Sequence, residues 1–336
     1  MRKIIFIALL ATLCVFSGAT QLFAGAAASK IYLGLSSVSL DYVPFWYAKD
    51  HNLYRKHGLD VDIITMGGGT ALTQALLAGG IPIAGIGAPF LQAAIHGADL
   101  VMLATHINYL PYRLIGHPSV SLEKGLKGSL IGISRFGSNS DLALRIALKQ
   151  SGIDPANDVT IVQLGGQTER FAALKTGRVQ ATTIAPPLSS AAKRMGFNVI
   201  LDMSKMRIPY PTIGVVSSRE FISNNRDTVK RFMQAYLESI RDIKKDKDGT
   251  VAVMAKYLKL DIKKDRDVLY DTYDETIASG EVEKRPYPNL EGIKFALNLI
   301  AKERNLAVPS NPKDFLDTTL LEELEKSGFI DNLYRQ

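Results

Sequence analysis

An internal repeat constrains the fold of this chain more than any other feature of the sequence. When the sequence is shifted by 98 residues, positions 63–89 fall on positions 161–187 without a gap, and nine of the 27 pairs are identical. Chance matching at ordinary composition would give roughly two identities. Each copy contains a Gly-Gly-x-Thr turn, which ends at Thr70 in the first copy and at Thr168 in the second. We therefore expect two lobes built on one plan.

The pattern inside each copy is typical of an α/β fold. Continuous apolar runs favour strands that are buried on both faces of a mostly parallel sheet. They lie at 31–35, 61–64, 81–86, 100–104, 130–133, 159–164, 179–184, 199–201 and 213–216. Helical stretches follow at 71–78, 89–96, 139–150 and 169–175. Strands that alternate with helices predict two doubly wound lobes.

After residue 217 the repeat ends, and apolar residues at spacings of three and four predict amphipathic helices. We expect these helices to pack outside the first lobe. The predicted division is a first lobe of residues 29–116 and 214–310, a second lobe of 117–213, and a C-terminal tail of 311–336. Two crossings, near 117–119 and 211–214, would form a hinge.

The N-terminus has the order of a secretory signal peptide. Arg2 and Lys3 precede an apolar run at 4–16, and small residues follow at 24–29. We expect cleavage after Ala26 or Ala28 and an exported, soluble mature protein. The single cysteine, Cys14, lies in this segment. The mature chain would therefore have neither a disulfide nor a thiolate nucleophile.

Charge and motif content argue against several partners. The formal charge of +7 falls to +5 when the segment holding Arg2 and Lys3 is removed. Acidic residues are interleaved with basic ones in the remaining chain, so we expect no nucleic-acid partner. No His-Glu-x-x-His motif or cluster of carboxylate ligands occurs in the sequence, which predicts neither a metal nor a cofactor.

The loops that follow matching strands predict a ligand-binding cleft. Ligands of open parallel sheets gather beyond the carboxyl ends of the strands, next to helix N-termini. Glycines such as Gly68 let the backbone approach a ligand and supply N–H donors, which favour anions. The serines can also be explained as strand ends, and the threonines as helix N-caps. The expected pairs across the cleft are Ser36, Thr70 and Ala88 opposite Ser134, Thr168 and Pro186.

Three further residues are candidates for ligand contact. Arg135 replaces the neutral Ser37 of the first copy, so a charge breaks the repeat at a cleft loop. Trp46 follows the first strand and could line an apolar part of the site, and His106 could meet an acidic group. The alternatives are a solvated arginine, a core tryptophan and a structural histidine.

The chain resembles the periplasmic solute-binding proteins of ABC importers for sulfonates, taurine and nitrate, a family that includes binders of thiamin-pyrimidine precursors. The resemblance rests on three motif groups and extends from about residue 30 to 305. These groups are Val43-Pro44-Phe45-Trp46-Tyr47-Ala48-Lys49 with His57-Gly58-Leu59-Asp60-Val61, Gly67-Gly68-Gly69-Thr70 with Ala75-Leu76-Leu77-Ala78-Gly79, and Leu174-Lys175-Thr176-Gly177 with Ala185-Pro186-Pro187.

The resemblance implies a type II periplasmic binding fold that captures a small solute for a membrane permease. It carries ligand contacts over to Ser36, Gly68, Thr70, Ala88, Ser134 and Thr168, with Trp46, His106 and Arg135 as additional candidates. We expect a monomer that binds a small organic anion, such as a sulfonate or carboxylate, and has no enzymatic activity. One alternative is a sensor that presents its closed form to a receptor. Another is an enzyme like the pyrimidine synthases of this fold, which use a cysteine-rich segment that the mature chain lacks.

Overall fold

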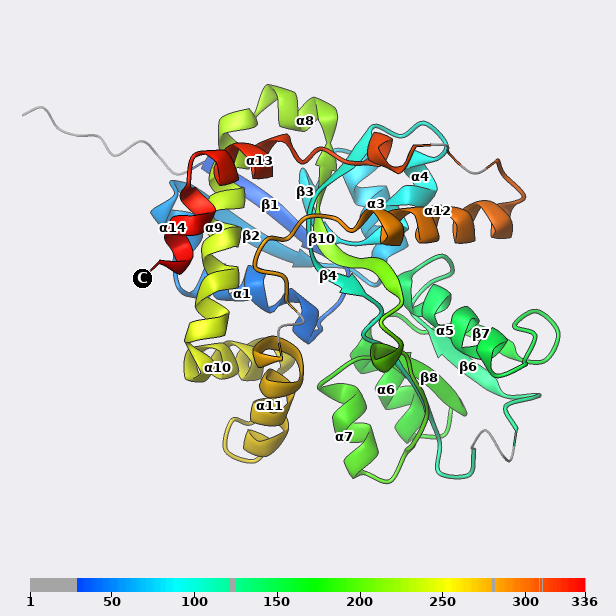
Figure 1. Ribbon diagram of the computed structural model, residues 1–336. Helices are drawn as coiled ribbons and strands as arrows, with labels where there is room; N and C mark the ends of the chain where they lie inside the picture. The colour runs from blue at the N-terminus through cyan, green and yellow to red at the C-terminus, as the bar shows by residue number, and fades with distance from the viewer. Residues whose placement is uncertain (1–28, 121–124, 280–281, 308, 310, 336) are drawn as a thin grey trace, which may run out of the picture.

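The computed structural model describes residues 29–335 except 121–124, 280–281, 308 and 310. The predicted signal peptide at 1–28 lies outside the described residues. In the described part, no helix has the length and apolar character needed to cross a membrane. Two five-stranded sheets, each covered by helices, form two lobes, and the second lobe lies at the lower right of Figure 1.

The first sheet has the strand order β2-β1-β3-β10-β4. Strand β1 pairs in parallel with β2 and β3, whereas β10 runs antiparallel to β3 and β4. The strands are β1 (Ser29–Leu35), β2 (Leu59–Thr65), β3 (Ile83–Ile86), β4 (Leu100–Tyr109) and β10 (Pro209–Ser218).

The second sheet repeats this arrangement with the order β7-β6-β8-β5-β9. Its strands are β5 (Arg113–Gly116), β6 (Leu130–Ile133), β7 (Thr160–Gln163), β8 (Ala181–Ile184) and β9 (Asn198–Asp202). The register is conserved as well, since Leu33 pairs with Ile63 in the first lobe and Ile131 pairs with Ile161 in the second. These positions differ by the offset of 98 found in the sequence, so the predicted duplication is confirmed.

Helices cover both sheets, and α5 begins and ends where the sequence predicted. The first lobe contains η1 (Leu40–Tyr42), α1 (Val43–Asp50), α2 (Leu53–Lys56), α3 (Gly69–Leu77), η2 (Ala88–Phe90) and α4 (Leu91–Ala94). The second lobe contains α5 (Asn139–Gln150), α6 (Gln167–Lys175), α7 (Leu188–Arg194) and η3 (Met203–Met206).

The C-terminal helices pack on the first lobe. Helix α9 lies against α1 and α2, and α13 and α14 lie against α9 (Figure 1). The apolar face of α9 joins β1 and α1 in one hydrophobic core. The elements are α8 (Arg219–Asn224), α9 (Arg226–Lys245), α10 (Lys247–Leu258), α11 (Arg266–Tyr273), the π-helical η4 (Asp274–Ala278), α12 (Leu290–Arg304), η5 (Pro312–Phe315), α13 (Thr319–Lys326) and α14 (Phe329–Tyr334).

The chain crosses between the lobes earlier than the sequence suggested. Strand β5 (Arg113–Gly116), predicted to lie in the first lobe, is inserted between β8 and β9 of the second sheet. The return strand β10 already pairs with β4 at Pro209. The first crossing is therefore 110–112 and the second lies between η3 and β10. Both inserted strands lie outside the aligned part of the repeat, so the repeat did not mark these boundaries.

Candidate functional site

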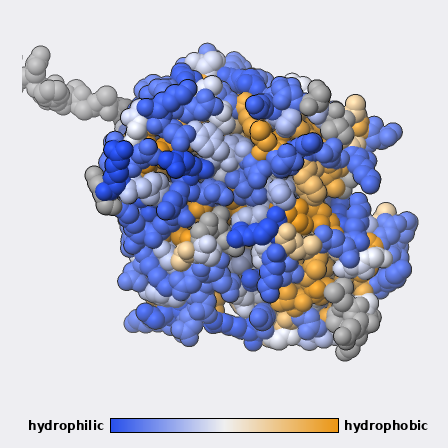
Figure 2. Space-filling view, viewed as in Figure 1, coloured by the Kyte–Doolittle hydropathy of each residue, from blue (hydrophilic) through white to orange (hydrophobic). Residues whose placement is uncertain are grey.

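A polar cavity lies where the two lobes meet. It encloses a volume of about 20 Å³, which is room for about one water molecule. Both lobes supply its walls. On the face of the molecule shown in Figure 2, hydrophobic side chains gather along the junction of the lobes and over the second lobe, and the rest of the face is mostly hydrophilic. We call the hollow lined by Ser36, Ser37, Gly68, Gly69, Pro89, Tyr112, Ser134, Ser138, Asn139, Ser140 and Arg170 the polar cavity.

Two helix N-termini converge on the polar cavity. Gly68 precedes α3 of the first lobe, and this helix begins without a side-chain cap. Ser138 caps α5 of the second lobe by accepting a hydrogen bond from the Asp141 N–H. The first N–H groups of a helix lack intrahelical partners, and the helix dipole adds partial positive charge there. The N–H groups of α3 therefore face the cavity, whereas the positive end of α5 is partly offset by the Asp141 carboxylate in its first turn, which accepts from the Gly137 N–H at 2.7 Å.

Three serine hydroxyls of the second lobe form a closed cluster on the cavity wall. The Oγ of Ser134 lies 2.7 Å from that of Ser138 and 2.9 Å from that of Ser140. The Ser138 and Ser140 oxygens are also 2.9 Å apart. Across the cavity, the Ser36 hydroxyl lies 2.5 Å from the Tyr42 hydroxyl. Hydroxyl groups can donate or accept, so this wall can turn donors toward an anion.

Arg170 is the main charge on the polar cavity. Its side chain is only 2% exposed, and its guanidinium donates to the carbonyls of Gly165 (2.6 Å) and Thr183 (3.2 Å). Its Nε is buried and has no hydrogen-bond partner. Burial lowers the pKa of Arg170 to about 10, so it remains protonated at neutral pH.

Within the part of the chain that the structure describes, no carboxylate forms an ion pair with Arg170. Among the described residues that line the polar cavity, none is an aspartate or glutamate. A buried charge is normally paired, because desolvation is costly. The neighbouring Glu169 raises the Arg170 pKa but is itself exposed. The cavity therefore combines an uncompensated cation with polar donors.

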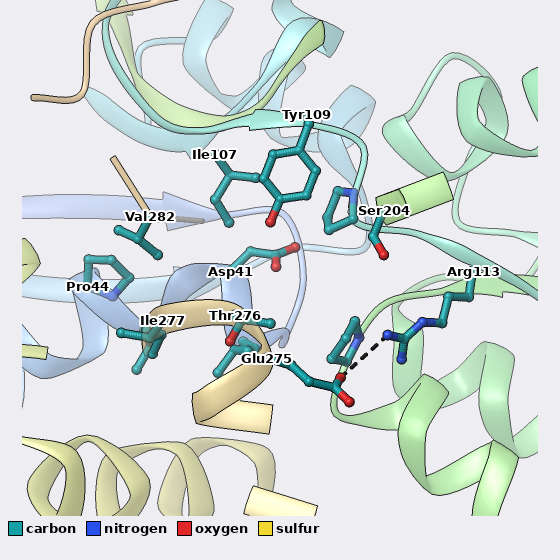
Figure 3. A pocket seen from close by; sticks show the side chains of 14 residues that line it. Asp41, Pro44, Ile107, Tyr109, Arg113, Ser204, Glu275, Thr276, Ile277 and Val282 are labelled. Carbon is teal, nitrogen blue, oxygen red and sulfur yellow. Dashed lines mark hydrogen bonds and ion pairs between the residues drawn. The ribbon is translucent and has the colours of Figure 1, made fainter. Parts of the chain in front are cut away.

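A second hollow between the lobes, the side chamber, is shown in Figure 3. It encloses a volume of about 30 Å³. At its mouth Arg113 of β5 forms an ion pair with Glu275 of η4 at 3.4 Å, and Asp202 binds the same guanidinium at 3.1 Å. The lining residues are Leu40, Asp41, Val43, Pro44, Ile107, Tyr109, Pro111, Arg113, Pro186, Ser204, Glu275, Thr276, Ile277 and Val282.

The structure brings four of the predicted site residues to these two hollows. Ser36, Gly68 and Ser134 line the polar cavity, and Pro186 lines the side chamber. All four follow strands or precede helices at the facing ends of the two sheets. This placement follows from the duplicated topology, which turns equivalent loops toward each other.

Two other predicted residues connect the lobes at the rim. The Thr70 hydroxyl donates to the Phe136 carbonyl at 3.0 Å, and Arg135 Nε donates to the Gly67 carbonyl at 2.9 Å. Arg135 is exposed and does not line the polar cavity. Thr70 lies inside α3 rather than at its N-cap, which is Gly68. These side chains therefore hold the lobes together in this structure.

The remaining four predicted residues lie away from the polar cavity. Trp46 is 1% exposed and stacks on Tyr257 inside the first lobe, with ring centroids 4.9 Å apart. Ala88 is fully buried, and its neighbour Pro89 reaches the cavity instead. Thr168 is exposed on α6, where Gly166 is the N-cap. The helical periodicity of α1 and α6 thus turns Trp46 and Thr168 away from the cleft.

His106 lies in the core of the first lobe and not on the cleft. Its Nε2 donates to the Asp41 carbonyl at 2.7 Å, which leaves Nδ1 to accept from the Tyr236 hydroxyl, also at 2.7 Å. Burial lowers the pKa of His106 to about 4, so the imidazole is neutral at neutral pH. The structure therefore places His106 as a hydrogen-bonded histidine of the core, which was the alternative to ligand contact.

The buried imidazole should make stability depend on pH. Between about pH 6.5 and pH 4 the unfolded state binds a proton at His106 that the folded state excludes. The free energy of unfolding is therefore expected to fall through this window as pH decreases, by up to about 3 kcal/mol from this group. Chemical denaturation of wild type and His106→Gln at pH 7 and pH 4.5 measures the difference. Equal losses in both proteins would contradict the assignment.

Sequence reasoning missed Arg170, although the repeat contained its signal. The offset of 98 places Arg170 on Leu72, a fully buried core residue of α3. A charge at a position that is apolar and buried in the other copy requires a special reason.

Comparison with known proteins identifies the family. The sequence profile described as NMT1/THI5 like matches residues 39–249. This chain belongs to the NMT1/THI5 like family. A candidate binding protein of Brucella abortus is 27% identical over 218 residues, which cover 64% of this chain and 67% of that protein. A candidate periplasmic binding protein of an ABC transporter from Brachyspira hyodysenteriae is 26% identical, over 62% of this chain and 63% of that protein.

Solved structures confirm the expected fold. The alkanesulfonate-binding protein SsuA from Xanthomonas axonopodis pv. citri, solved with MOPS bound, superposes with a TM-score of 0.67 at 20% identity. The match covers 85% of this chain and 96% of that protein. The NMT1/THI5 like chain therefore has the two-lobed fold of periplasmic binding proteins.

Proposed function

We propose that this protein is exported, captures a small organic anion between its lobes as a monomer, and delivers it to the permease of an ABC importer. The observation that carries the proposal is Arg170, a buried guanidinium with a free Nε and no carboxylate partner in a cavity that both lobes share. A ligand with an acidic group would supply the missing counter-ion. The serine cluster and two helix N-termini would donate to its remaining oxygens.

The relatives support the transport part of the proposal. One is a candidate periplasmic binding protein of an ABC transporter, and the structural neighbour is an alkanesulfonate-binding protein. A sulfonate ligand, the kind that this neighbour binds, is consistent with the polar cavity of the present protein, which presents N–H, O–H and guanidinium donors. Capture between lobes also fits the chain topology, because Pro111 and Tyr112 of the first crossing line the two hollows and the crossings can act as a hinge.

A thermal-shift screen tests the ligand class. Sulfonates and carboxylates should raise the unfolding temperature, since a ligand at 100 times its Kd adds about 2.7 kcal/mol to the free energy of unfolding. Uncharged amides and alcohols of the same size serve as controls. Stabilisation by the uncharged compounds alone would contradict the proposal of an anionic ligand.

A further inference from the structure

We propose that a helical arm of the first lobe latches the second lobe through two ion pairs, so that the cleft closes partly without a ligand and opens as the salt concentration rises. The acidic arm consists of α11 and η4, residues 266–278. Its Asp271 pairs with Arg194 of α7 at 2.6 Å. Its Glu275 pairs with Arg113 of β5 at 3.4 Å (Figure 3). The inference goes beyond the proposed function, because it does not depend on which ligand is bound.

The acidic arm is fixed to the first lobe. Leu269, Tyr273 and Ile277 are buried in the hydrophobic core that also contains residues of α1 and α9. The Tyr273 hydroxyl donates to the Lys244 carbonyl of α9 at 3.2 Å. On its other side, α11 lies beside α7 of the second lobe (Figure 1). The arm therefore moves with the first lobe, and separation of the lobes must break both ion pairs.

Both latch carboxylates face the second lobe. Asp271 and Glu275 are four residues apart, a spacing that brings side chains to one side of a helix. They line a single groove together with their two arginine partners. The neighbouring Asp274 instead pairs with Lys247 of α10, inside the first lobe, at 2.7 Å. The arm also becomes π-helical from Asp274 onward, and π-helical turns are rare and frequent at functional sites.

The second lobe holds Arg113 ready for the arm. Asp202 accepts from its Nε at 3.1 Å, and the hydroxyls of Ser189 and Ser190 each accept from Nη1 at 3.2 Å. These three partners belong to β9 and α7, so they move with Arg113. The remaining nitrogen, Nη2, donates to Glu275. A guanidinium that is already oriented loses less side-chain entropy when the ion pair forms.

The latch is weak enough to be opened by salt. Arg194 and Asp271 are 47% and 63% exposed, and the groove beside them encloses about 770 Å³. Water and ions therefore reach the ion pairs, and salt screens exposed charges. Exposed ion pairs contribute little individually, so we expect the two together to favour the closed state by about threefold to tenfold. A shift of this size changes the population of closed molecules without locking the cleft.

Distances between spin labels on the two lobes test the latch without any ligand. The one cysteine of the sequence, Cys14, lies in the predicted signal peptide, so introduced cysteines would be the only labelling sites of the mature chain. Asn224→Cys on α8 and Arg178→Cys before β8 label an exposed position on each lobe. The ratio of closed to open molecules should fall about threefold to tenfold between about 20 mM and about 500 mM sodium chloride.

Neutral variants locate the effect. Asp271→Asn combined with Glu275→Gln should lower the ratio at low salt by the same factor and remove its dependence on salt. Asp274→Asn is the matched control, because it breaks a similarly exposed ion pair of the same arm that lies within the first lobe. This control should leave the ratio unchanged. All three residues are exposed, and thermal unfolding checks that each variant is folded.

Exchanging the charges of one pair tests the contact itself. Asp271→Arg alone should open the lobes, and adding Arg194→Asp should restore the ratio to within about twofold of wild type. A ratio that does not respond to salt, or that is equal in the neutral double variant and the Asp274→Asn control, would overturn the inference. Because no ligand takes part, that result would leave the proposed function standing. Failure of every anion to bind would reject the proposed function and leave the latch unaffected.

Discussion

Arg170→Met is expected to weaken binding of the anionic ligand by about a hundredfold or more, while the ligand-free protein remains folded. Truncating one partner of a buried, hydrogen-bonded charge pair typically costs about 2–5 kcal/mol of binding free energy. In the proposed complex the ligand supplies the acidic group that is missing among the described residues lining the polar cavity. Calorimetric titration of the strongest anion from the thermal-shift screen measures the change in Kd.

The fold should tolerate this substitution because the equivalent residue of the first copy is Leu72, which is apolar and fully buried. Methionine removes a desolvated charge but also two hydrogen bonds, to the Gly165 and Thr183 carbonyls. These effects oppose each other, and we expect the free energy of unfolding without ligand to change by less than about 2 kcal/mol.

Arg178→Met is the matched control for charge. Arg178 is exposed on the same lobe, so the variant has the same net charge but an unchanged cavity. Arg170→Lys keeps the cation and should bind with intermediate affinity, since lysine lacks the planar fork. If Arg170→Met and Arg178→Met bind the anion equally well, Arg170 does not recognise the acidic group.

Gly68→Ala is expected to weaken ligand binding about tenfold or more by obstructing closure of the lobes. Gly68 has a φ of +118°, and an added Cβ would lie 3.2 Å from the Ser134 Oγ of the other lobe. That approach is closer than carbon and oxygen normally make. The closed state should therefore be less populated, and the apparent Kd rises by the same factor. Calorimetry and small-angle scattering with and without ligand measure both effects.

Gly79→Ala separates closure from backbone strain. Gly79 also has a positive φ, +74°, but a Cβ there would meet no atom within 4 Å. Both variants should lower the free energy of unfolding by about 1–2 kcal/mol because alanine is strained at positive φ. Only Gly68→Ala should lose affinity. Equal affinities of the two variants would show that the contact between Gly68 and Ser134 does not limit closure.

The sequence predicted the fold well because the pattern of strands and helices occurs twice. Each copy therefore supports the prediction made for the other. Buried parallel strands have continuous apolar runs, so β1, β3, β6 and β8 could be located from hydropathy alone. The offset of 98 then predicted equivalent lobes, and the strand registers repeat at that offset. Strand β5 was placed in the wrong lobe and the start of β10 was missed, because pairing with a distant strand is not encoded in local periodicity.

A site residue could be predicted from the sequence only where the course of the backbone fixes its position. Ser36, Gly68 and Ser134 follow strands at the facing edges, and they reach the polar cavity. Trp46 lies within a helix, where a rotation of 100° per residue separates cleft from core, and the sequence could not resolve its direction. For Arg170 the sequence did contain the information, through its pairing with Leu72.

A crystal structure of the wild-type protein with the most stabilising anion tests the central claim most directly. We predict that the acidic oxygens lie within hydrogen-bond distance of the Arg170 guanidinium and the Ser134 hydroxyl, with both lobes in contact with the ligand. A ligand whose acidic group lies outside the polar cavity, or that contacts one lobe alone, would contradict the account.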